Sequence, residues 1–311
     1  MTTPADIDPN RFAVHTATPR GFTQAYVHEN PTSRKGVPLV CVHGWPETKR
    51  IYWKVIAPLV AAGCEVIVPD LRGFGDSEIG PDGFHDVASH SADLYALVHD
   101  HLGHESVVLL GGDLGGPIIQ DLALRHPQWV DRMVLFNSPL PYLKDQMAGI
   151  ANTRAPRESA DYFFAQGTAP ERVMAGLANA DARTDYIATF YMSRYWAHPG
   201  AFTSLPGEVD FHTAPFADAA KLRASFGAYE SSFSAEARVA PSMIGPNAHT
   251  PTLILFGPSD HVLYPAFDQM AAVVFERHTG PFLLRDCGHF VPWEAPHALV
   301  SGTIAFCSDL L

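Results

Sequence analysis

The hydrophobic residues of the chain gather in short, unbroken runs that alternate with longer amphipathic stretches. Unbroken apolar runs bounded by loop residues are typical of strands buried on both faces of a parallel sheet. The alternation of such runs with helical patterns predicts a parallel, doubly wound α/β sheet. Strands are predicted at 38–43, 64–70, 106–112 and 132–139, with two shorter ones within 12–30, and helices at 50–62, 91–102 and 116–127.

The alternation of strand and helix stops near residue 140. Residues 140–248 contain no buried-strand pattern, and their Ala, Tyr and Phe content indicates helices joined by loops rich in Pro and Gly. Because sites in open sheets lie beyond the carboxyl ends of the strands, a segment inserted there would cover the site. Strands resume at 250–257 and 281–286, and a helix from residue 296 closes the chain. We therefore expect a core domain of residues 1–139 and 249–311, and a helical cap of residues 140–248 inserted after the sixth strand.

Composition narrows the classes of function. Of the 311 residues, 47% are hydrophobic and 17% are charged, which allows a sizeable core. The net charge of -12 disfavours nucleic acid and anionic membranes as partners. The N-terminus has no signal-peptide pattern, and the chain has no run of about 18 apolar residues, so we expect a cytoplasmic protein without a membrane span. The four cysteines form no CxxC pair, and three of them lie in or beside apolar stretches, which is typical of buried thiols in a cytosolic protein.

One histidine-rich stretch raises the question of a metal. His99, Asp100, His101 and His104 gather at the end of the helix predicted over 91–102. Metal ligands must converge on one point, and a surface connection at a helix end does not promise that geometry. We therefore expect neither a metal nor a cofactor.

The stretch GGDLGG (111–116) places a carboxylate, Asp113, at the tip of a buried strand and between pairs of glycines. Glycines allow the strained torsions and close packing of a sharp turn from strand to helix. The N–H groups of the following helix favour an anion and keep the carboxylate ionised. A rigid, exposed and ionised carboxylate is a nucleophile. The alternative is that Asp113 only caps the helix over 115–126, and the turn alone does not decide between the two.

The order of three residues favours the nucleophile. Gly-x-Asp-x-Gly-Gly after an apolar strand resembles the nucleophile elbow of the α/β-hydrolase fold, with Asp113 where esterases have serine. That family has the order nucleophile, acid, histidine, which Asp260 in LFGPSDHV and His289 in DCGHFVPWE match. The resemblance covers 35–140 and 248–310. It implies a mostly parallel, eight-stranded sheet flanked by helices, with an inserted helical cap.

A second motif resembles a narrower group of that family. HGWP (43–46) is similar to the HGxP motif of epoxide hydrolases and their dehalogenase relatives. The resemblance implies an oxyanion hole formed by the backbone N–H groups of Trp45 and Leu114. The residues expected to bind substrate are His43, Pro46 and Phe290.

A carboxylate nucleophile suits attack on a saturated carbon, which would give an alkyl ester of Asp113. His289 would then activate water to hydrolyse the ester, with Asp260 orienting the imidazole. Opening an epoxide leaves an alkoxide, and epoxide hydrolases usually protonate it with two cap tyrosines. The segment RASFGAYES (223–231) resembles the place of one, which indicates Tyr229. The nearest tyrosine for the second is Tyr162, and the alternatives are Tyr186, Tyr191 and Tyr195.

The leading interpretation is an epoxide hydrolase that converts a small-molecule epoxide and water into a vicinal diol. The alternative is a hydrolytic dehalogenase with the same Asp-His-Asp residues. Haloalkane dehalogenases usually carry a tryptophan directly after the nucleophile, and fluoroacetate dehalogenases usually have arginines near the nucleophile. This chain has Leu114 directly after Asp113, which matches neither pattern. Gly112 and Leu114 also depart from the His and Trp common in epoxide hydrolases, which bears on substrate preference. A non-catalytic ligand-binding protein of the same fold is a third interpretation, and the sequence leaves a homodimer open.

Overall fold

The computed structural model describes residues 4–32, 36–151 and 160–311. In these residues an eight-stranded sheet has the order β1-β2-β4-β3-β5-β6-β7-β8. Strand β2 pairs antiparallel with β1 and β4, and the remaining pairs are parallel. The mostly parallel sheet is therefore confirmed. The strands are β1 (Val14–Ala17), β2 (Gln24–Glu29), β3 (Leu39–Val42), β4 (Val66–Pro69), β5 (Val107–Gly111), β6 (Val130–Phe136), β7 (Thr252–Phe256) and β8 (His278–Leu283).

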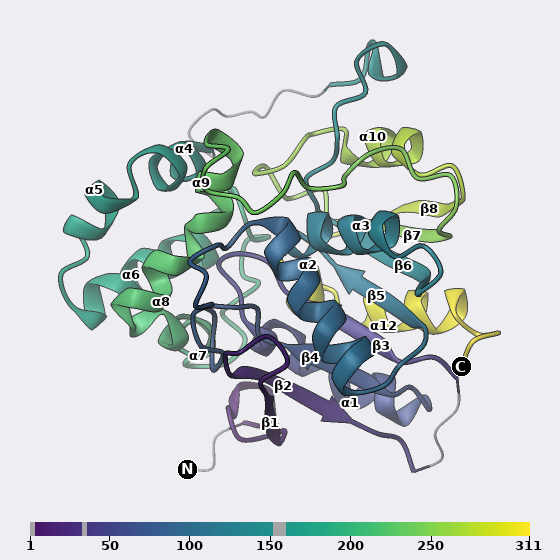
Figure 1. Cartoon of the computed structure of the whole chain (residues 1–311), viewed down its shortest axis with the longest axis horizontal. Coiled ribbons are helices and arrows are strands. Elements are labelled where there is room, and N and C mark those ends of the chain that lie inside the picture. Colours follow the sequence, from purple (N-terminus) through teal and green to yellow (C-terminus); the bar gives the residue numbers. More distant parts are fainter. Residues whose placement is uncertain (1–3, 33–35, 152–159) are drawn as a thin grey trace.

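Helices cover both faces of the sheet (Figure 1). Helices α2 (Val87–Tyr95) and α3 (Gly115–Arg125) lie in front of it, and α1 (Trp53–Ala61) and α12 (Pro296–Phe306) lie behind. Every residue of β3, β4, β5 and β7 is buried as a result. This explains why these strands appear in the sequence as unbroken apolar runs. Two further helices follow β7 and β8, namely α10 (Phe267–Val274) and α11 (Val291–Glu294).

Several element boundaries differ from the sequence prediction; for example, β6 spans Val130–Phe136 rather than 132–139. Strand β8 begins at His278 rather than at 281, because its exposed side chains at the sheet edge leave no apolar run to mark its start. The helix predicted over 91–102 begins earlier, at Val87, and its last part is a π-helical turn, Ala96–His101. The helix predicted over 50–62 begins with a 3-10 turn, Lys49–Tyr52, whose N-cap Thr48 accepts a hydrogen bond from the backbone N–H of Arg50.

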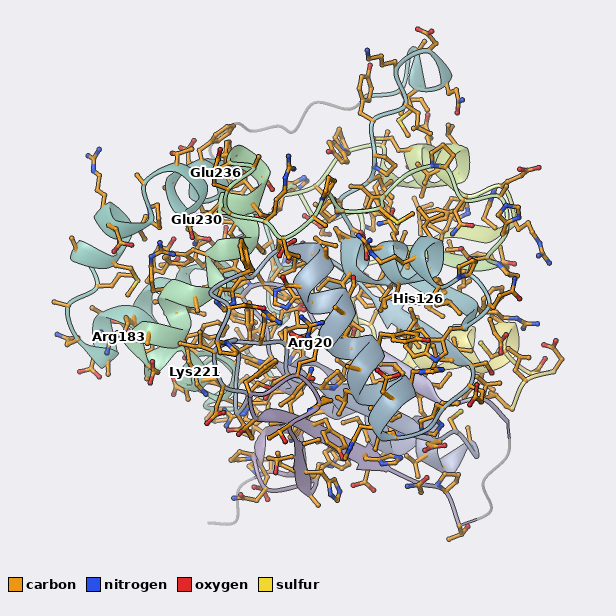
Figure 2. The ribbon with its side chains drawn as sticks, viewed as in Figure 1. Arg20, His126, Arg183, Lys221, Glu230 and Glu236 are labelled. Atoms are coloured by element: carbon orange, nitrogen blue, oxygen red, sulfur yellow. The ribbon has the colours of Figure 1, made fainter. Side chains whose placement is uncertain are left out.

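The chain between β6 and β7 is helical in its described part. These helices gather together on one side of the sheet, at the left of Figure 1. Figure 2 shows Arg183 and Lys221 on them: the Lys221 ammonium donates to the Gly75 carbonyl at 2.6 Å and so ties the inserted segment to the loop after β4. The inserted helices are α4 (Asp161–Thr168), α5 (Pro170–Ala175), α6 (Ala180–Tyr191), α7 (Glu208–Thr213), α8 (Ala219–Ser225) and α9 (Gly227–Phe233).

The described residues also contain short 3-10 turns, and one of them, Lys49–Tyr52, is given above. The others are η1 (Ala5–Ile7), η4 (Lys144–Met147) and η6 (Ala214–Ala217). None of the helices in the described ranges has both the length and the apolar character needed to cross a membrane.

Candidate active site

The turn between β5 and α3 presents the carboxylate of Asp113. The backbone of Asp113 has a φ of 44°, in the left-handed region that residues other than glycine rarely adopt. Its N–H donates to the Asn137 carbonyl at 2.8 Å, which holds the turn against β6. A Cβ on Gly44 would come within 2.5 Å of the Asp113 Cβ, so the neighbouring loop approaches the carboxylate more closely than a side chain would allow. Helix α3 begins at Gly115, so the positive end of its dipole lies directly after this carboxylate.

Asp113, Asp260 and His289 lie in contact although they come from three separate loops. The His289 Nδ1 is 2.8 Å from Asp260 Oδ2, and its Nε2 is 3.3 Å from Asp113 Oδ2. The three residues are at most 7% exposed. The Nε2 atom makes no hydrogen bond of acceptable geometry to the described residues. This geometry suits an imidazole that is oriented on one side by a carboxylate and acts on water beside another.

The carboxylate of Asp260 is held by groups from its own loop and from β6. Its Oδ1 accepts the backbone N–H groups of Val262 at 2.7 Å and Leu263 at 3.3 Å. Its Oδ2 accepts the side-chain amide of Asn137 at 3.0 Å. Asn137 also bonds both the N–H and the carbonyl of Gly257, so it fixes the end of β7. The place of Asn137 was not found from the sequence, because an amide after a strand carries no catalytic signature.

The backbone N–H of Trp45 donates to Asp113 Oδ1 at 2.7 Å. It therefore lies where an oxyanion on this carboxylate would form. Leu114, the other residue expected in the oxyanion hole, is the N-cap of α3 and lines the same pocket as Asp113.

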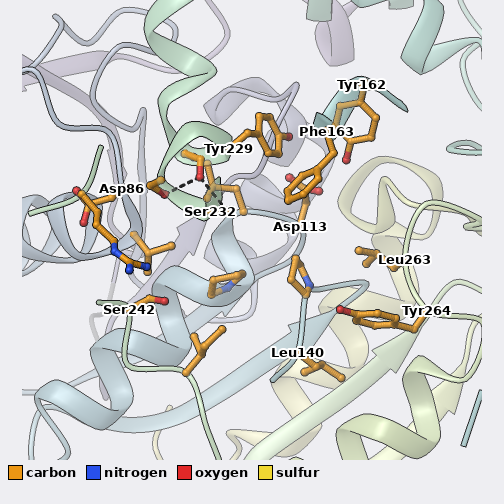
Figure 3. A pocket seen from close by; sticks show the side chains of 18 of the residues that line it. Asp86, Asp113, Leu140, Tyr162, Phe163, Tyr229, Ser232, Ser242, Leu263 and Tyr264 are labelled. Carbon is orange, nitrogen blue, oxygen red and sulfur yellow. Dashed lines mark hydrogen bonds between the residues drawn. The ribbon is translucent and has the colours of Figure 1, made fainter. Parts of the chain in front are cut away.

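A cavity of about 310 Å³ opens beside Asp113 (Figure 3). This is within the usual range for small-molecule sites. In Figure 3 Tyr162, Phe163 and Tyr229 lie together above Asp113, while Leu140 and Tyr264 lie on the other side of it. The polar residues Asp86, Ser232 and Ser242 lie together at one end of the view. The cavity lining is therefore largely aromatic and apolar around the carboxylate.

Both tyrosines expected to donate a proton line this cavity. The Tyr162 ring stacks on Trp45, with centroids 5.4 Å apart, and meets the Tyr229 ring edge-on at 5.6 Å. Burial, with Tyr162 and Asp113 nearby, raises the pKa of Tyr229 well above its ordinary value, so its phenol stays protonated. Its hydroxyl is buried and makes no hydrogen bond of acceptable geometry to the described residues.

The alternative tyrosines are placed differently. The hydroxyl of Tyr186 accepts from the Gln166 amide at 2.8 Å, and that of Tyr191 donates to the Pro46 carbonyl at 2.6 Å. None of Tyr186, Tyr191 and Tyr195 is among the residues that line the cavity.

Comparison with known proteins assigns the family. The profile described as alpha/beta hydrolase fold matches residues 37–296. The chain belongs to the alpha/beta hydrolase fold family. The expected fold class is therefore correct, and the family together with its neighbours indicates a hydrolase.

Relatives of this hydrolase include two enzyme classes. A soluble epoxide hydrolase of Corynebacterium sp. (strain C12) is 37% identical over 123 residues, which span 40% of this chain and 41% of that protein. A fluoroacetate dehalogenase of Burkholderia sp is 27% identical over 282 residues, 88% of each chain. The solved structure of epoxide hydrolase CorEH without ligand has a TM-score of 0.79 at 24% identity, covering 96% of this chain and 100% of that chain. The match to the first relative thus spans about two fifths of its length.

Three residues expected to bind substrate do not line the cavity of this hydrolase. The ring of His43 is fully buried: its Nδ1 lies 2.8 Å from the Gly44 carbonyl, and its Nε2 accepts the Leu71 N–H at 3.0 Å. Burial lowers the pKa of His43 to about 4, so the ring is neutral. Phe290 is also fully buried and stacks on Tyr191, whose hydroxyl in turn bonds the carbonyl of Pro46. Rather than lining the cavity, His43, Pro46 and Phe290 support the loop that carries Trp45, because their polar and aromatic groups contact other parts of the protein.

One further carboxyl in the site was not found from the sequence. Glu47 follows the HGWP motif, is buried, and accepts the Gly44 N–H at 2.5 Å. Burial raises the pKa of Glu47 to about 7, with His289 opposing the shift and Asp113 adding to it. A glutamate three residues after a glycine has no sequence signature, so only its contacts reveal its place.

The histidine residues near residue 100 do not converge. His99 stacks on Tyr95 and pairs with Asp100, whereas His104 turns toward Glu65. All four cysteines are buried and free, as expected of thiols in apolar surroundings.

Proposed function

We propose that this hydrolase opens a small-molecule epoxide to a vicinal diol through a covalent ester of Asp113. One observation supports this most strongly: two phenols, Tyr162 and Tyr229, line the cavity around an aspartate nucleophile. Breaking a C–O bond of an epoxide leaves an alkoxide, which needs a proton donor. A buried tyrosine whose pKa is raised is a suitable donor, because it holds its proton until the alkoxide forms.

The first step is alkylation of Asp113. Its Oδ1 is held by the Trp45 N–H, so Oδ2 is the oxygen that attacks an epoxide carbon. The new bond joins Oδ2 to that carbon, the C–O bond of the ring breaks, and the ring oxygen takes a proton from Tyr229 or Tyr162. The product is a hydroxyalkyl ester of Asp113 and a tyrosinate that recovers its proton later in the cycle.

The second step is hydrolysis of the ester by water. Burial disfavours the charged imidazole of His289, but Asp260 and Asp113 outweigh it and raise the pKa of His289 well above its ordinary value. Esterification removes the charge of Asp113, so this pKa falls and the imidazole becomes able to take a proton from water. The hydroxide attacks the ester carbonyl carbon, and the Trp45 N–H, with that of Leu114, stabilises the oxyanion. Collapse breaks the ester C–O bond. The departing oxygen takes the proton held by His289 and leaves as the diol, and the remaining proton of the Asp113 carboxyl returns to the tyrosinate. This restores the Asp113 carboxylate, so epoxide and water are the only reactants consumed.

A hydrolytic dehalogenase is the second candidate, favoured by the match to the fluoroacetate dehalogenase over 282 residues, 88% of this chain. The same three residues could displace a halide from a saturated carbon. A haloacid would also need a cation for its carboxylate close to the nucleophile. Arg238 is the cation among the residues that line the cavity, but it lies far from Asp113 in the chain, and the lining residues that follow the nucleophile, Leu114 and Pro117, carry no charge. We therefore place the dehalogenase reaction second. We also propose that residues 140–248 form the cap that supplies the two tyrosine hydroxyls.

The deciding experiment follows two products at once. Purified protein is incubated with a panel of aryl and alkyl epoxides and haloacids, and diol and free halide are measured together. Diol without halide supports the proposal. Halide without diol would assign the dehalogenase reaction, and binding without either product would leave a ligand-binding protein of this fold.

A variant then tests the covalent intermediate. His289→Gln lacks the base for the second step, so we expect the ester to accumulate, visible as the mass of one epoxide added to the protein. Asp113→Ala is the matched control and should neither gain mass nor form diol. Turnover of His289→Gln at the wild-type rate would contradict the mechanism.

A further inference from the structure

Three potential metal ligands converge at the end of the sheet opposite Asp113. Glu65 directly precedes β4, His104 precedes β5, and His28 lies on β2. The nucleophile follows the carboxyl end of β5, whereas Glu65 and His104 lie at the amino ends of the parallel strands. This cluster, which we call the His28–Glu65–His104 cluster, is therefore separate from the catalytic residues.

The candidate ligand atoms are close to one another. The Glu65 Oε1 is 2.7 Å from the His28 Nε2 and 3.3 Å from the His104 Nε2. One ligand atom from each residue lies within 4.8 Å of the other two. Glu65 and His104 are buried, and the His28 side chain is 21% exposed, so one edge of the cluster reaches solvent. An ion could enter by that edge.

The backbone that carries these side chains is rigid. His28 pairs with Ile67 in the sheet, and the carbonyl of Glu65 accepts the Leu39 N–H at 2.9 Å. The carbonyl of His104 accepts the Trp129 indole N–H at 2.9 Å. His28 lies on a strand, and these backbone hydrogen bonds hold the loop positions of Glu65 and His104 in place. The cluster needs only side-chain adjustment to bind an ion.

We propose that the His28–Glu65–His104 cluster binds one Zn²⁺ ion. Two imidazoles and a carboxylate with a water in the fourth position are a common zinc ligand set, with bonds of about 2.0–2.2 Å. Tetrahedral bonds of that length put ligand atoms about 3.3 Å apart, which is the separation of Glu65 and His104. The contact of His28 with Glu65 would have to lengthen by about 0.6 Å. Both rings bind through Nε2 as neutral imidazoles, with their proton on Nδ1.

A bound ion would tie β2 to the segments before β4 and β5, and so stabilise the fold. Zinc added in 100-fold excess over its Kd should raise the melting temperature by roughly 5 °C. The probe is ZnCl2 added to protein stripped with a chelator, with stoichiometry from isothermal titration. CoCl2 gives a second readout, because Co²⁺ in a tetrahedral site has strong visible absorption bands.

Three variants remove one ligand each: His104→Ala, Glu65→Gln and His28→Ala. Of these, His28→Ala should disturb the core least, because the His28 side chain reaches solvent. His15→Ala is the control, since its exposed ring lies 6.5 Å from that of His28 and outside the cluster. We expect one ion per chain in wild type and His15→Ala, and at least a 10-fold weaker affinity in the three cluster variants. Diol formation by chelator-stripped protein should be unchanged, because the cluster is remote from Asp113.

Two results would overturn the proposal. Absence of Zn²⁺ binding and of a melting shift in wild type at 100 μM zinc would leave a hydrogen-bonded His–Glu–His cluster. Equal affinity in wild type and His28→Ala would place the ion elsewhere on the protein. Neither result bears on the epoxide reaction, which is measured separately.

Discussion

Replacing Tyr229 by phenylalanine separates its proposed catalytic role from any structural one. The hydroxyl of Tyr229 is buried and makes no hydrogen bond of acceptable geometry to the described residues. Tyr229→Phe keeps the buried ring and removes only a hydroxyl that interacts with Tyr162, so we expect the free energy of unfolding to change by less than about 1 kcal/mol. A hydrogen bond to a charged group contributes about 1.5–3 kcal/mol. Loss of that bond to the developing alkoxide should slow alkylation of Asp113 roughly 10- to 150-fold.

The assay is a single-turnover experiment with excess enzyme, in which the ester of Asp113 is followed by mass and the diol by chromatography. Tyr162→Phe should slow the same step, and the double variant should be slower than either. Tyr186→Phe is the matched control, because its hydroxyl bonds Gln166 rather than lining the cavity. Alkylation at the wild-type rate in Tyr229→Phe, with stability unchanged, would refute the role given to this phenol.

Three further predictions concern the surroundings of the nucleophile. In Asp113→Ala the pKa of His289 should fall, because one of the two carboxylates that raise it is gone; NMR titration of the ring checks this, and an unchanged pKa would contradict it. The pKa of Glu47 rises from 4.5 to about 7 on folding, so its contribution to stability is full below pH 4.5 and lost as the pH passes 7. The free energy of unfolding should therefore fall by roughly 3 kcal/mol over this pH range in wild type, and this fall should be absent in Glu47→Gln. Denaturant unfolding at pH 5 and pH 8 measures it, and an equal pH dependence in the variant and wild type would contradict the prediction. Gly44→Ala puts a Cβ 2.5 Å from that of Asp113 and should lower diol formation at least 100-fold, whereas Gly302→Ala, with its nearest neighbour at 3.4 Å, should not. Equal activity in both glycine variants would show that the loop can yield.

The tyrosines of the inserted helices mark where prediction from the sequence weakens. Tyr162 and Tyr229 line the cavity, whereas the hydroxyl of Tyr191 bonds a backbone carbonyl and that of Tyr186 bonds a glutamine side chain. Short helices joined by irregular loops have no periodicity that fixes which way each side chain points. Their directions depend on contacts with distant residues, such as the stacking of Tyr162 on Trp45.

The sequence by itself determined the mostly parallel sheet and the order of Asp113, Asp260 and His289 along it. Strands buried on both faces leave unbroken apolar runs, and the carboxyl ends of parallel strands meet at one edge, so residues after successive strands come together. The tertiary structure alone decided which polar groups form structural contacts and which face the cavity. In the folded chain His43 accepts the Leu71 N–H, Asn137 donates to Asp260, and His104 lies beside Glu65 rather than beside His99. Such pairings join residues far apart in the chain, and local spacing carries no record of them.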